Sequence, residues 1–198
     1  MLLVFSLDIA AQSKIAYEQY GYVHQPGEPV FVPILRFETS KQWHVETRYN
    51  YEDANTVSLF AGKTFTTGNA LNCDITPMAG FSAGNFTGVS LALNTEATYK
   101  KFYLWTQSQY SKATKTNTPD FFFNWSELSY KITDYFFAGL TMQYTRETGI
   151  NKLEPGFTAS FSYKDVTIPV YVFNPFRKGN YFVFGLTYEY TMKKHTKI

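Results

Sequence analysis

Residues 180–190 read Asn-Tyr-Phe-Val-Phe-Gly-Leu-Thr-Tyr-Glu-Tyr, and this stretch decides the fold of the chain. Side chains alternate between the two faces of a strand, so every second residue shares a face. One face is mixed and more polar, with Thr187 and Glu189 among its members. The other face is apolar and almost entirely aromatic, and consists of Phe182, Phe184, Leu186, Tyr188 and Tyr190. An aromatic strand face that ends in Tyr-x-Tyr is typical of a strand meeting the boundary between hydrocarbon and water.

The same alternation continues through the rest of the chain, with no helical period of useful length. Residues 43–51 are the clearest example, because Trp43 and Val45 share one face while His44, Glu46 and Arg48 share the other. The predicted strands cover residues 14–24, 30–38, 43–51, 56–65, 72–81, 87–99, 101–110, 121–132, 135–146, 153–163, 166–174 and 180–190.

About twelve strands of roughly ten residues fit an all-β fold, a closed antiparallel transmembrane β-barrel. A strand in lipid has no water to satisfy its backbone, so such a sheet must close on itself. If residues 14–24 form no strand, a barrel of about ten strands is the alternative. A soluble lipocalin-like ligand-binding barrel also stays open, because alternation alone does not say which face is outside.

The connections differ in length in a regular order. Short turns are expected at residues 133–134 and 164–165, and longer polar segments at 111–119, 147–152 and 175–179. Counted back from a periplasmic C-terminus, the short turns fall on the periplasmic side and the longer segments on the outer side. Short periplasmic turns with longer outer loops are expected of a transmembrane β-barrel.

A resemblance supports the membrane interpretation. The pattern Gly185-x-x-Tyr188-x-Tyr190 resembles the closing-strand signal of bacterial outer-membrane β-barrel proteins. In that family the barrel-assembly machinery reads the signal, so the resemblance implies an assembly role for Gly185, Tyr188 and Tyr190. It also implies a location in the bacterial outer membrane, with the lipid bilayer as surroundings. Residues 191–198 follow Tyr190 here, whereas many members of the family stop at the aromatic residue.

Composition agrees with a membrane barrel. The 198 residues suit one domain. Charged residues make up 17% of the chain, fewer than the roughly 25% of ordinary soluble domains, and aromatic residues make up 19%. The formal net charge of +2 gives no case for a nucleic-acid partner. Cys73 is the single cysteine, which excludes an internal disulfide and a cysteine-based metal site.

The two ends of the chain differ from the barrel domain predicted over residues 13–190. Residues 1–12 place an apolar stretch before Ala10 and Ala11, which predicts the remnant of a cleaved signal peptide. A positive region before the apolar stretch is missing and Asp8 interrupts it, so a short buried strand is the alternative. Residues 191–198 are predicted to form a basic tail that is solvated, with contact to anionic head groups or to a periplasmic partner as the alternative. A further, unknown outer-membrane partner of the barrel also stays open.

If the aromatic face meets lipid, the polar face points into the barrel. A barrel of this size has a narrow interior, so charges there must pair or hold water. The main prediction is therefore a structural or partner-binding barrel with a polar network in its lumen. A narrow channel for a small polar solute is the alternative. The predicted lumen residues are Arg36, Glu38, His44, Glu46, Arg48, Glu96, Glu127, Glu154 and Glu189.

Aromatic residues near the predicted strand ends are expected to form two girdles at the membrane interfaces. These residues are Trp43, Tyr49, Tyr51, Trp125, Tyr130, Tyr188 and Tyr190.

A lipid-acting outer-membrane enzyme centred on His44 is a second alternative. Nucleophilic catalysis requires a histidine within hydrogen-bond reach of a hydroxyl group. His44 is followed by Val45 and Glu46, with no serine at the adjacent inward position, so no catalytic residue is predicted. His44 and Glu46 would supply two metal ligands without a dependable third, so neither a metal nor a cofactor is expected.

Overall fold

The structure is a computed structural model that describes residues 12–24 and 27–192 of the chain. Residues 1–11 of the predicted signal segment and residues 193–198 of the predicted tail lie outside the described residues. The described part is built of strands joined by turns and loops. The strands are β1 (Lys14–His24), β2 (Val30–Glu38), β3 (Trp43–Tyr49), β4 (Val57–Lys63), β5 (Phe65–Gly68), β6 (Leu71–Ala83), β7 (Gly88–Tyr99), β8 (Phe102–Ala113), β9 (Phe121–Lys131), β10 (Phe136–Glu147), β11 (Ile150–Tyr163), β12 (Val166–Phe173) and β13 (Tyr181–Thr191).

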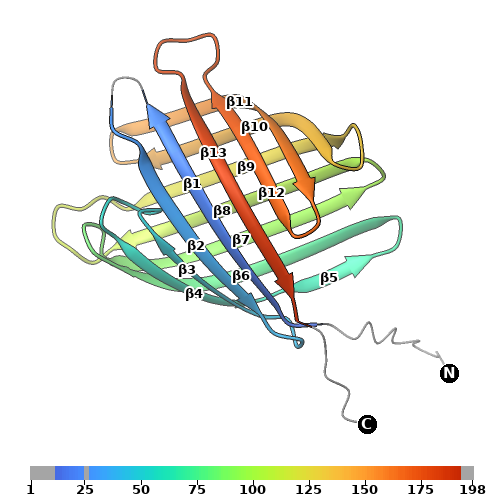
Figure 1. Ribbon diagram of the computed structural model, residues 1–198. Coiled ribbons are helices and arrows are strands. Elements are labelled where there is room, and N and C mark those ends of the chain that lie inside the picture. The colour runs from blue at the N-terminus through green and yellow to red at the C-terminus, as the bar shows by residue number, and fades with distance from the viewer. Residues whose placement is uncertain (1–11, 25–26, 193–198) are drawn as a thin grey trace.

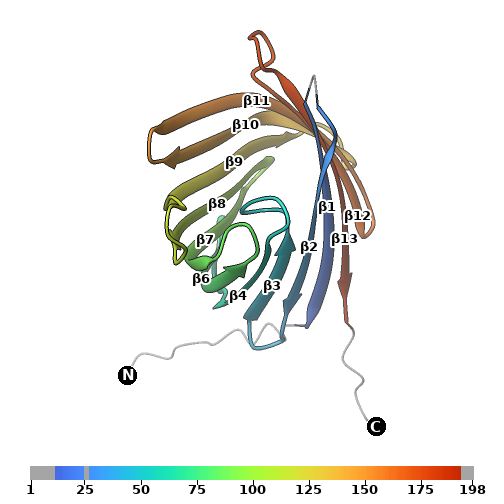
Figure 2. The same cartoon turned by 90° about the vertical axis from the view of Figure 1, so that its left-hand side faces the viewer.

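These strands form one antiparallel sheet that closes around a common interior (Figure 1 and Figure 2). β1 pairs with both β2 and β13, and Lys14 lies opposite Thr191. At the other junction β4 pairs with β6, with Val57 opposite Ala83. β4 and β5 occupy one position in the ring because both pair with β6. The barrel therefore has twelve strands, and the predicted closed antiparallel barrel is confirmed.

The break between β4 and β5 has a local cause. The pairing of Gly62 with Met78 and that of Phe65 with Ile75 keep one register, which leaves Pro77 within the gap. Proline has no backbone N–H to donate to the ladder, so the pairing is interrupted there. The sequence predicts one strand over residues 56–65, whereas the structure interrupts this segment at Thr64 and continues it to Gly68.

β1 begins and β13 ends at one end of the barrel, here called the near end, and the opposite end is called the far end (Figure 1). Short turns at residues 100–101 and 164–165 lie at the near end, and the loops at 114–120 and 174–180 lie at the far end. The prediction of a longer outer loop over residues 147–152 is wrong. β10 reaches Glu147 and β11 starts at Ile150, because Gly149 adopts a φ of 82° that permits a tight turn.

The outer face of the barrel is apolar. On a soluble protein such an apolar surface would promote aggregation, whereas the lipid-facing band of a membrane barrel has to be apolar. The soluble lipocalin-like alternative needs the aromatic strand face inside, and the structure places that face outside. Exposed apolar side chains on the outer face include Leu35, Val45, Leu59, Leu91, Leu140, Phe157, Phe161, Ile168, Phe184 and Leu186. Among the described residues, no helix is long and apolar enough to cross a membrane.

Most of the predicted girdle residues are exposed on the outer face, but two are not. Trp125 exposes 1% of its surface and lies inside the barrel, and Tyr51 packs against the same interior residues. Trp125 points inward because it shares a face of β9 with Glu127, and a narrow interior is filled by bulky side chains. Tyr51 follows the end of β3, where Asn50 has a φ of 59° and the strand alternation stops. The exposed girdle residues are Trp43, Tyr49, Tyr130, Tyr188 and Tyr190.

The packed core lies inside the barrel. Burying a large apolar side chain contributes roughly 1.5–3 kcal/mol relative to leaving it exposed. The core joins strands that do not pair with each other, so it fixes the shape of the ring. Its largest group, here called the aromatic cluster, consists of Tyr20, Val32, Ile34, Trp125, Tyr171, Phe173, Tyr181 and Val183.

Candidate functional site in the barrel lumen

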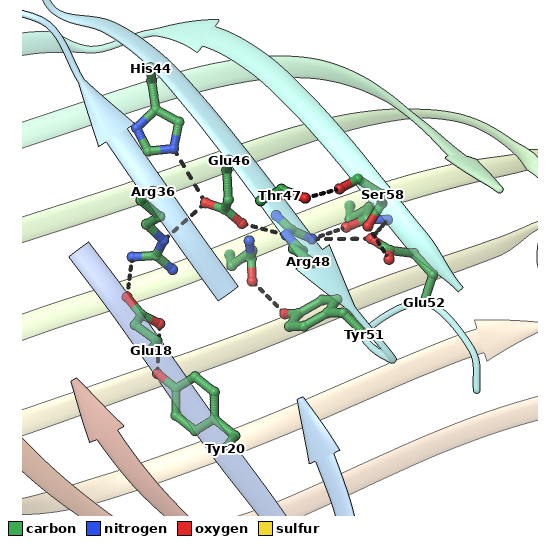
Figure 3. Close-up of polar contacts among 12 residues, drawn as sticks. Glu18, Tyr20, Arg36, His44, Glu46, Thr47, Arg48, Tyr51, Glu52 and Ser58 are labelled. Carbon is green, nitrogen blue, oxygen red and sulfur yellow. Dashed lines mark hydrogen bonds and ion pairs between the residues drawn. The ribbon is translucent and has the colours of Figure 1, made fainter. Parts of the chain in front are cut away.

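A chain of ion pairs runs along the inner face of β1, β2 and β3 (Figure 3). Arg36 Nη1 lies 2.8 Å from Glu18 Oε1, and Arg36 Nε lies 3.0 Å from Glu46 Oε2. Glu46 also contacts Arg48 through its other oxygen, and His44 Nε2 at 3.3 Å. These five residues are here called the ion-pair network. Glu46 and Arg48 are completely buried. Their mutual ion pair offsets the free-energy cost of removing both charges from water, which an unpaired ion would bear in full.

The strand register places this network. Arg36 lies directly opposite Glu46 in the ladder between β2 and β3. Glu18 lies opposite Ile34 in the ladder between β1 and β2, which makes it the diagonal neighbour of Arg36. Opposite charges in direct and diagonal cross-strand positions are within reach and favourable. Alternation directs all three side chains inward, and register then brings the opposite charges together.

Arg48 extends the network toward a strand with which β3 does not pair. Its Nη1 donates to Gln109 Oε1 on β8 at 2.7 Å. Its guanidinium carbon lies 4.4 Å from the ring centre of Tyr51 and 4.3 Å from that of Phe60. The ring faces attract the cation where oxygen partners are missing. Arg48 therefore ties β3 to β8 across the interior and narrows it.

The structure brings four of the predicted lumen residues together, namely Arg36, His44, Glu46 and Arg48 (Figure 3). Glu38 lies at the edge of this group. Its Oε2 is 3.9 Å from His44 Nδ1 and accepts a hydrogen bond from Thr64 at 2.6 Å.

The other predicted lumen residues lie apart from the network. Glu127 is buried on β9, where it accepts hydrogen bonds from Ser129 at 2.5 Å and Tyr171 at 3.1 Å. Glu189 lies near the end of β13, 3.7 Å from Lys14 Nζ. Two further carboxylates accept hydrogen bonds elsewhere: Glu96 from Tyr103 at 3.2 Å, and Glu154 from Asn174 at 3.1 Å.

Sequence reasoning missed three carboxylates, Glu18, Glu52 and Asp74, the last of which lines an interior cavity beside Glu38 and Glu96. Glu18 shares an inward face of β1 with Ala16 and Tyr20, so the period of two was a usable signal. Glu52 lies in the loop after β3, where no period predicts the direction of a side chain. Its Oε1 lies 3.4 Å from Arg48 Nη1 and accepts a hydrogen bond from Gln109 at 3.2 Å.

His44 lies among carboxylates. In the described part of the chain, its polar partners are Glu46 and Glu38. The hydroxyl of Thr64 donates to Glu38. A histidine activates a hydroxyl nucleophile only when that hydroxyl forms a hydrogen bond with the imidazole ring itself. The geometry around His44 therefore supports a charge-pairing role.

Trp125 lies at the centre of the aromatic cluster. Its ring centre is 5.4 Å from that of Tyr20, 5.1 Å from Tyr171 and 5.7 Å from Trp105. The ring of Tyr22 lies 6.5 Å away. Its indole Nε1 donates to Thr141 Oγ1 at 3.0 Å, which satisfies the one polar group of the side chain.

Cavities lie on both sides of Trp125 along β9, because Glu127 lines one of them and Phe123 lines the other. A cavity of about 290 Å³ is lined by its neighbours Tyr20, Trp105 and Tyr171, and another of about 230 Å³ is lined by Tyr22. A third cavity, of about 110 Å³, lies at the near end. Arg36 lines both the largest and the smallest of the three. The interior is thus a row of small cavities, with the Trp125 ring between the largest and the one toward the far end.

The residues of the predicted assembly signal divide between the two faces of β13. Tyr188 and Tyr190 are exposed on the outer face. Gly185 faces the lumen opposite Tyr20, and a Cβ there would lie 2.6 Å from the Pro169 ring and 3.0 Å from the Tyr20 ring. The absence of a side chain at Gly185 therefore makes room for Tyr20 in the aromatic cluster.

Comparison with known proteins identifies the fold. No protein-family model matches the sequence, and no curated protein matches it. Among solved structures, the KdgM porin superposes with a TM-score of 0.66 at 10% identity, covering 87% of this chain and 98% of that chain. The NanC porin gives a TM-score of 0.58 at 9% identity, covering 89% of this chain and 100% of that one. An outer membrane channel from Pseudomonas putida F1 gives 0.55 at 12% identity, covering 96% and 100%.

The likeness concerns the fold, and it extends over nearly the whole of each neighbour. It agrees with the apolar exterior, the closed ring and the difference in length between near-end turns and far-end loops. The chain therefore has the closed β-barrel fold of bacterial outer-membrane porins, the fold that its closing strand predicts.

Proposed function

We propose that this chain is a narrow outer-membrane channel for small polar solutes, with its near end toward the periplasm. The observation that carries the proposal is the row of cavities inside the barrel, which continues on both sides of Trp125. A barrel built only for rigidity gains nothing from cavities, because empty or water-filled space lowers packing energy.

The structural neighbours support a channel over the structural role that composition and patterning favour. KdgM and NanC are named porins, and one structure holds the KdgM porin in complex with disordered oligogalacturonate. The interior here is narrow, because Arg48 and Trp125 both lie across it. We therefore infer a solute of a few non-hydrogen atoms for this chain.

Liposome swelling tests the proposal. Proteoliposomes with the full-length protein are placed in isosmotic glycerol, arabinose, glucose and raffinose, and the rate of swelling is compared with that of empty liposomes. The expected result is entry of glycerol with a steep fall toward raffinose. Trp125→Ala is expected to admit larger solutes, whereas Tyr130→Ala, which removes an outward aromatic side chain from the same strand, leaves the size limit unchanged. Swelling rates equal to those of empty liposomes, with folded protein in the membrane, would contradict the channel.

A structural or partner-binding barrel is the second candidate. The aromatic cluster favours it, because Trp125, Phe173 and Val183 are almost completely buried where an open pore would run. This candidate predicts that Trp125→Ala destabilises the barrel without admitting any solute. Size-dependent swelling by the wild-type protein excludes it.

We also propose that β13 presents the assembly signal to the barrel-assembly machinery. Tyr188 and Tyr190 support this, because both are exposed near the end of the closing strand. Tyr190→Ala is expected to lower the fraction of chains that reach the heat-modifiable folded form in cells. Tyr163→Ala is the matched control, because Tyr163 is a similarly exposed aromatic residue at the end of β11. Equal losses in both variants would point to a general interfacial effect.

A further inference from the structure

The small cavity at the near end has an excess of carboxylates. Among the described residues, those that line it include four acidic side chains, and two side chains, Lys14 and Arg36, that carry a permanent positive charge. A pocket lined mainly by one sign of charge concentrates ions of the opposite sign. The four acidic residues are Glu38, Asp74, Glu96 and Glu189.

The two positive charges are already engaged. Arg36 lies between Glu18 at 2.8 Å and Glu46 at 3.0 Å, and Lys14 Nζ lies 3.7 Å from Glu189. In the described part of the chain, no ion pair reaches Asp74 or Glu96. The charge of these two carboxylates is therefore left for a ligand to neutralise.

Strand register brings Asp74 and Glu96 together. They lie directly opposite each other in the ladder between β6 and β7, and Thr76 and Asn94 form the next inward pair. Like charges directly opposite each other on a sheet destabilise it. A cation between the two carboxylates would convert this repulsion into attraction.

Unpartnered oxygen atoms point to the same ligand independently of the charge. Asn94 exposes 6% of its surface, and its Oδ1 has no hydrogen-bond partner among the described residues. Asp74 Oδ1 is also buried without a partner in that part of the chain. Both residues line the cavity beside Glu96. A buried oxygen without a donor is costly, and a set of oxygen atoms is what a small hard cation prefers.

We propose that Asp74, Asn94 and Glu96 form a binding site for small cations, and that this site makes the channel cation-selective. The selectivity rests on the proposed channel function, whereas the binding site does not. Acidic side chains at a pore entrance favour cation passage by electrostatic attraction. Glu127 lines the neighbouring large cavity, so a further carboxylate lies beyond the near-end cavity.

Reversal potentials in planar bilayers test the selectivity. With the full-length protein between two KCl solutions of unequal concentration, the expected potential corresponds to a K⁺ permeability roughly tenfold above that of Cl⁻. The double variant Asp74→Asn, Glu96→Gln is expected to bring the ratio close to unity. It is also expected to fold, because it removes a repulsion. High salt is expected to weaken the wild-type preference, since ions screen exposed charges.

Asp134→Asn is the matched control. Asp134 is a carboxylate in the near-end turn after β9, outside the cavity, and Lys131 Nζ lies 2.9 Å from it. The Lys131 ammonium group lowers the pKa of the Asp134 carboxyl, so the control also removes a charged carboxylate. The control is expected to keep the wild-type permeability ratio. A wild-type ratio near unity, a preference for Cl⁻, or equal shifts in the double variant and the control would overturn the proposed selectivity.

Thermal unfolding in calcium chloride separates the binding site from the channel. A ligand that binds only the folded state raises the unfolding midpoint. One outcome is that bilayers carry no current while Ca²⁺ raises the unfolding midpoint of the wild type and leaves that of the double variant unchanged. This outcome would contradict the channel function and support the cation-binding site. Current without ion preference, together with an unfolding midpoint that Ca²⁺ does not change, would support the channel function and contradict the cation-binding site. Neither current nor a Ca²⁺ effect would overturn both.

Discussion

The ion-pair network and the aromatic cluster share one narrow lumen but hold it together by different means. The network lies along β1, β2 and β3, where neighbouring strands place opposite charges side by side. The cluster gathers around Trp125 from strands such as β9 and β12 that do not pair with each other. Tyr20 joins the two regions, because its hydroxyl donates to Glu18 at 3.0 Å while its ring packs on Trp125.

The difference lies in how each region responds to a lost group. A buried charge depends on its partner, so removing one member leaves the others uncompensated. An apolar cluster depends on volume, so removing or adding atoms has a graded cost. We therefore expect the charged region to fail abruptly and the aromatic region to fail gradually.

Glu46→Gln is expected to have the largest effect. Glu46 is the carboxylate between Arg36 and Arg48, and its neutralisation leaves two buried guanidinium groups without their shared counter-charge. We expect the free energy of unfolding to fall by about 3–5 kcal/mol. Urea titration of the protein in detergent or lipid, followed by tryptophan fluorescence, measures this.

Glu189→Gln serves as the control for this prediction. Glu189 forms an exposed pair with Lys14 at 3.7 Å, so we expect a loss of about 0–1 kcal/mol. Equal losses for Glu46→Gln and Glu189→Gln would show that burial adds nothing to the network.

Gly185→Ala is expected to have an intermediate effect on the aromatic side. The added methyl group would lie 2.6 Å from Pro169 and 3.0 Å from the Tyr20 ring, so both must move. Overpacking of this kind costs about 1–3 kcal/mol in the free energy of unfolding. Gly21→Ala on β1 is the control, because its methyl group would meet Phe31 at an ordinary 3.5 Å. A stability unchanged by Gly185→Ala would contradict the packing role of Gly185.

Tyr20→Phe is expected to have the smallest effect, at the junction of the two regions. The change keeps the ring packed on Trp125 and removes the hydroxyl that donates a hydrogen bond to Glu18. We expect a loss of about 1 kcal/mol in the free energy of unfolding, measured by the same urea titration. Tyr17→Phe, which removes an exposed hydroxyl from the same strand, is expected to change it less. A loss as large as that of Glu46→Gln would mean that Tyr20 belongs to the network itself.

The period of two in the sequence predicted most of the strands and their faces. The strands at residues 14–24 and 30–38 have the predicted bounds, and Phe182, Phe184 and Leu186 face outward. Residue type alone did not place Trp125, because an aromatic side chain suits a membrane interface and a barrel interior equally. Strand alternation on β9 indicates the correct direction, because Trp125 lies on the same inward face as Glu127.

The contacts of the lumen needed information that the period does not hold. Pairing of Arg36 with Glu18 and Glu46 depends on the register between β1, β2 and β3, which a single sequence does not fix. Glu52 enters from a loop, where direction has no period. The distance from Arg48 to Gln109 depends on barrel closure, which joins strands far apart in the sequence.

The most direct test of the account is the single-channel conductance of the wild-type protein beside that of Trp125→Ala. Both proteins are first shown to be folded by their different mobility in gels before and after boiling, and Trp125→Phe replaces the alanine variant if that variant does not fold. The account predicts a small, steady conductance for the wild type and one several times larger for the variant, because the Trp125 ring separates two cavities. Silent bilayers for both folded proteins, or identical conductance, would contradict a channel divided by Trp125.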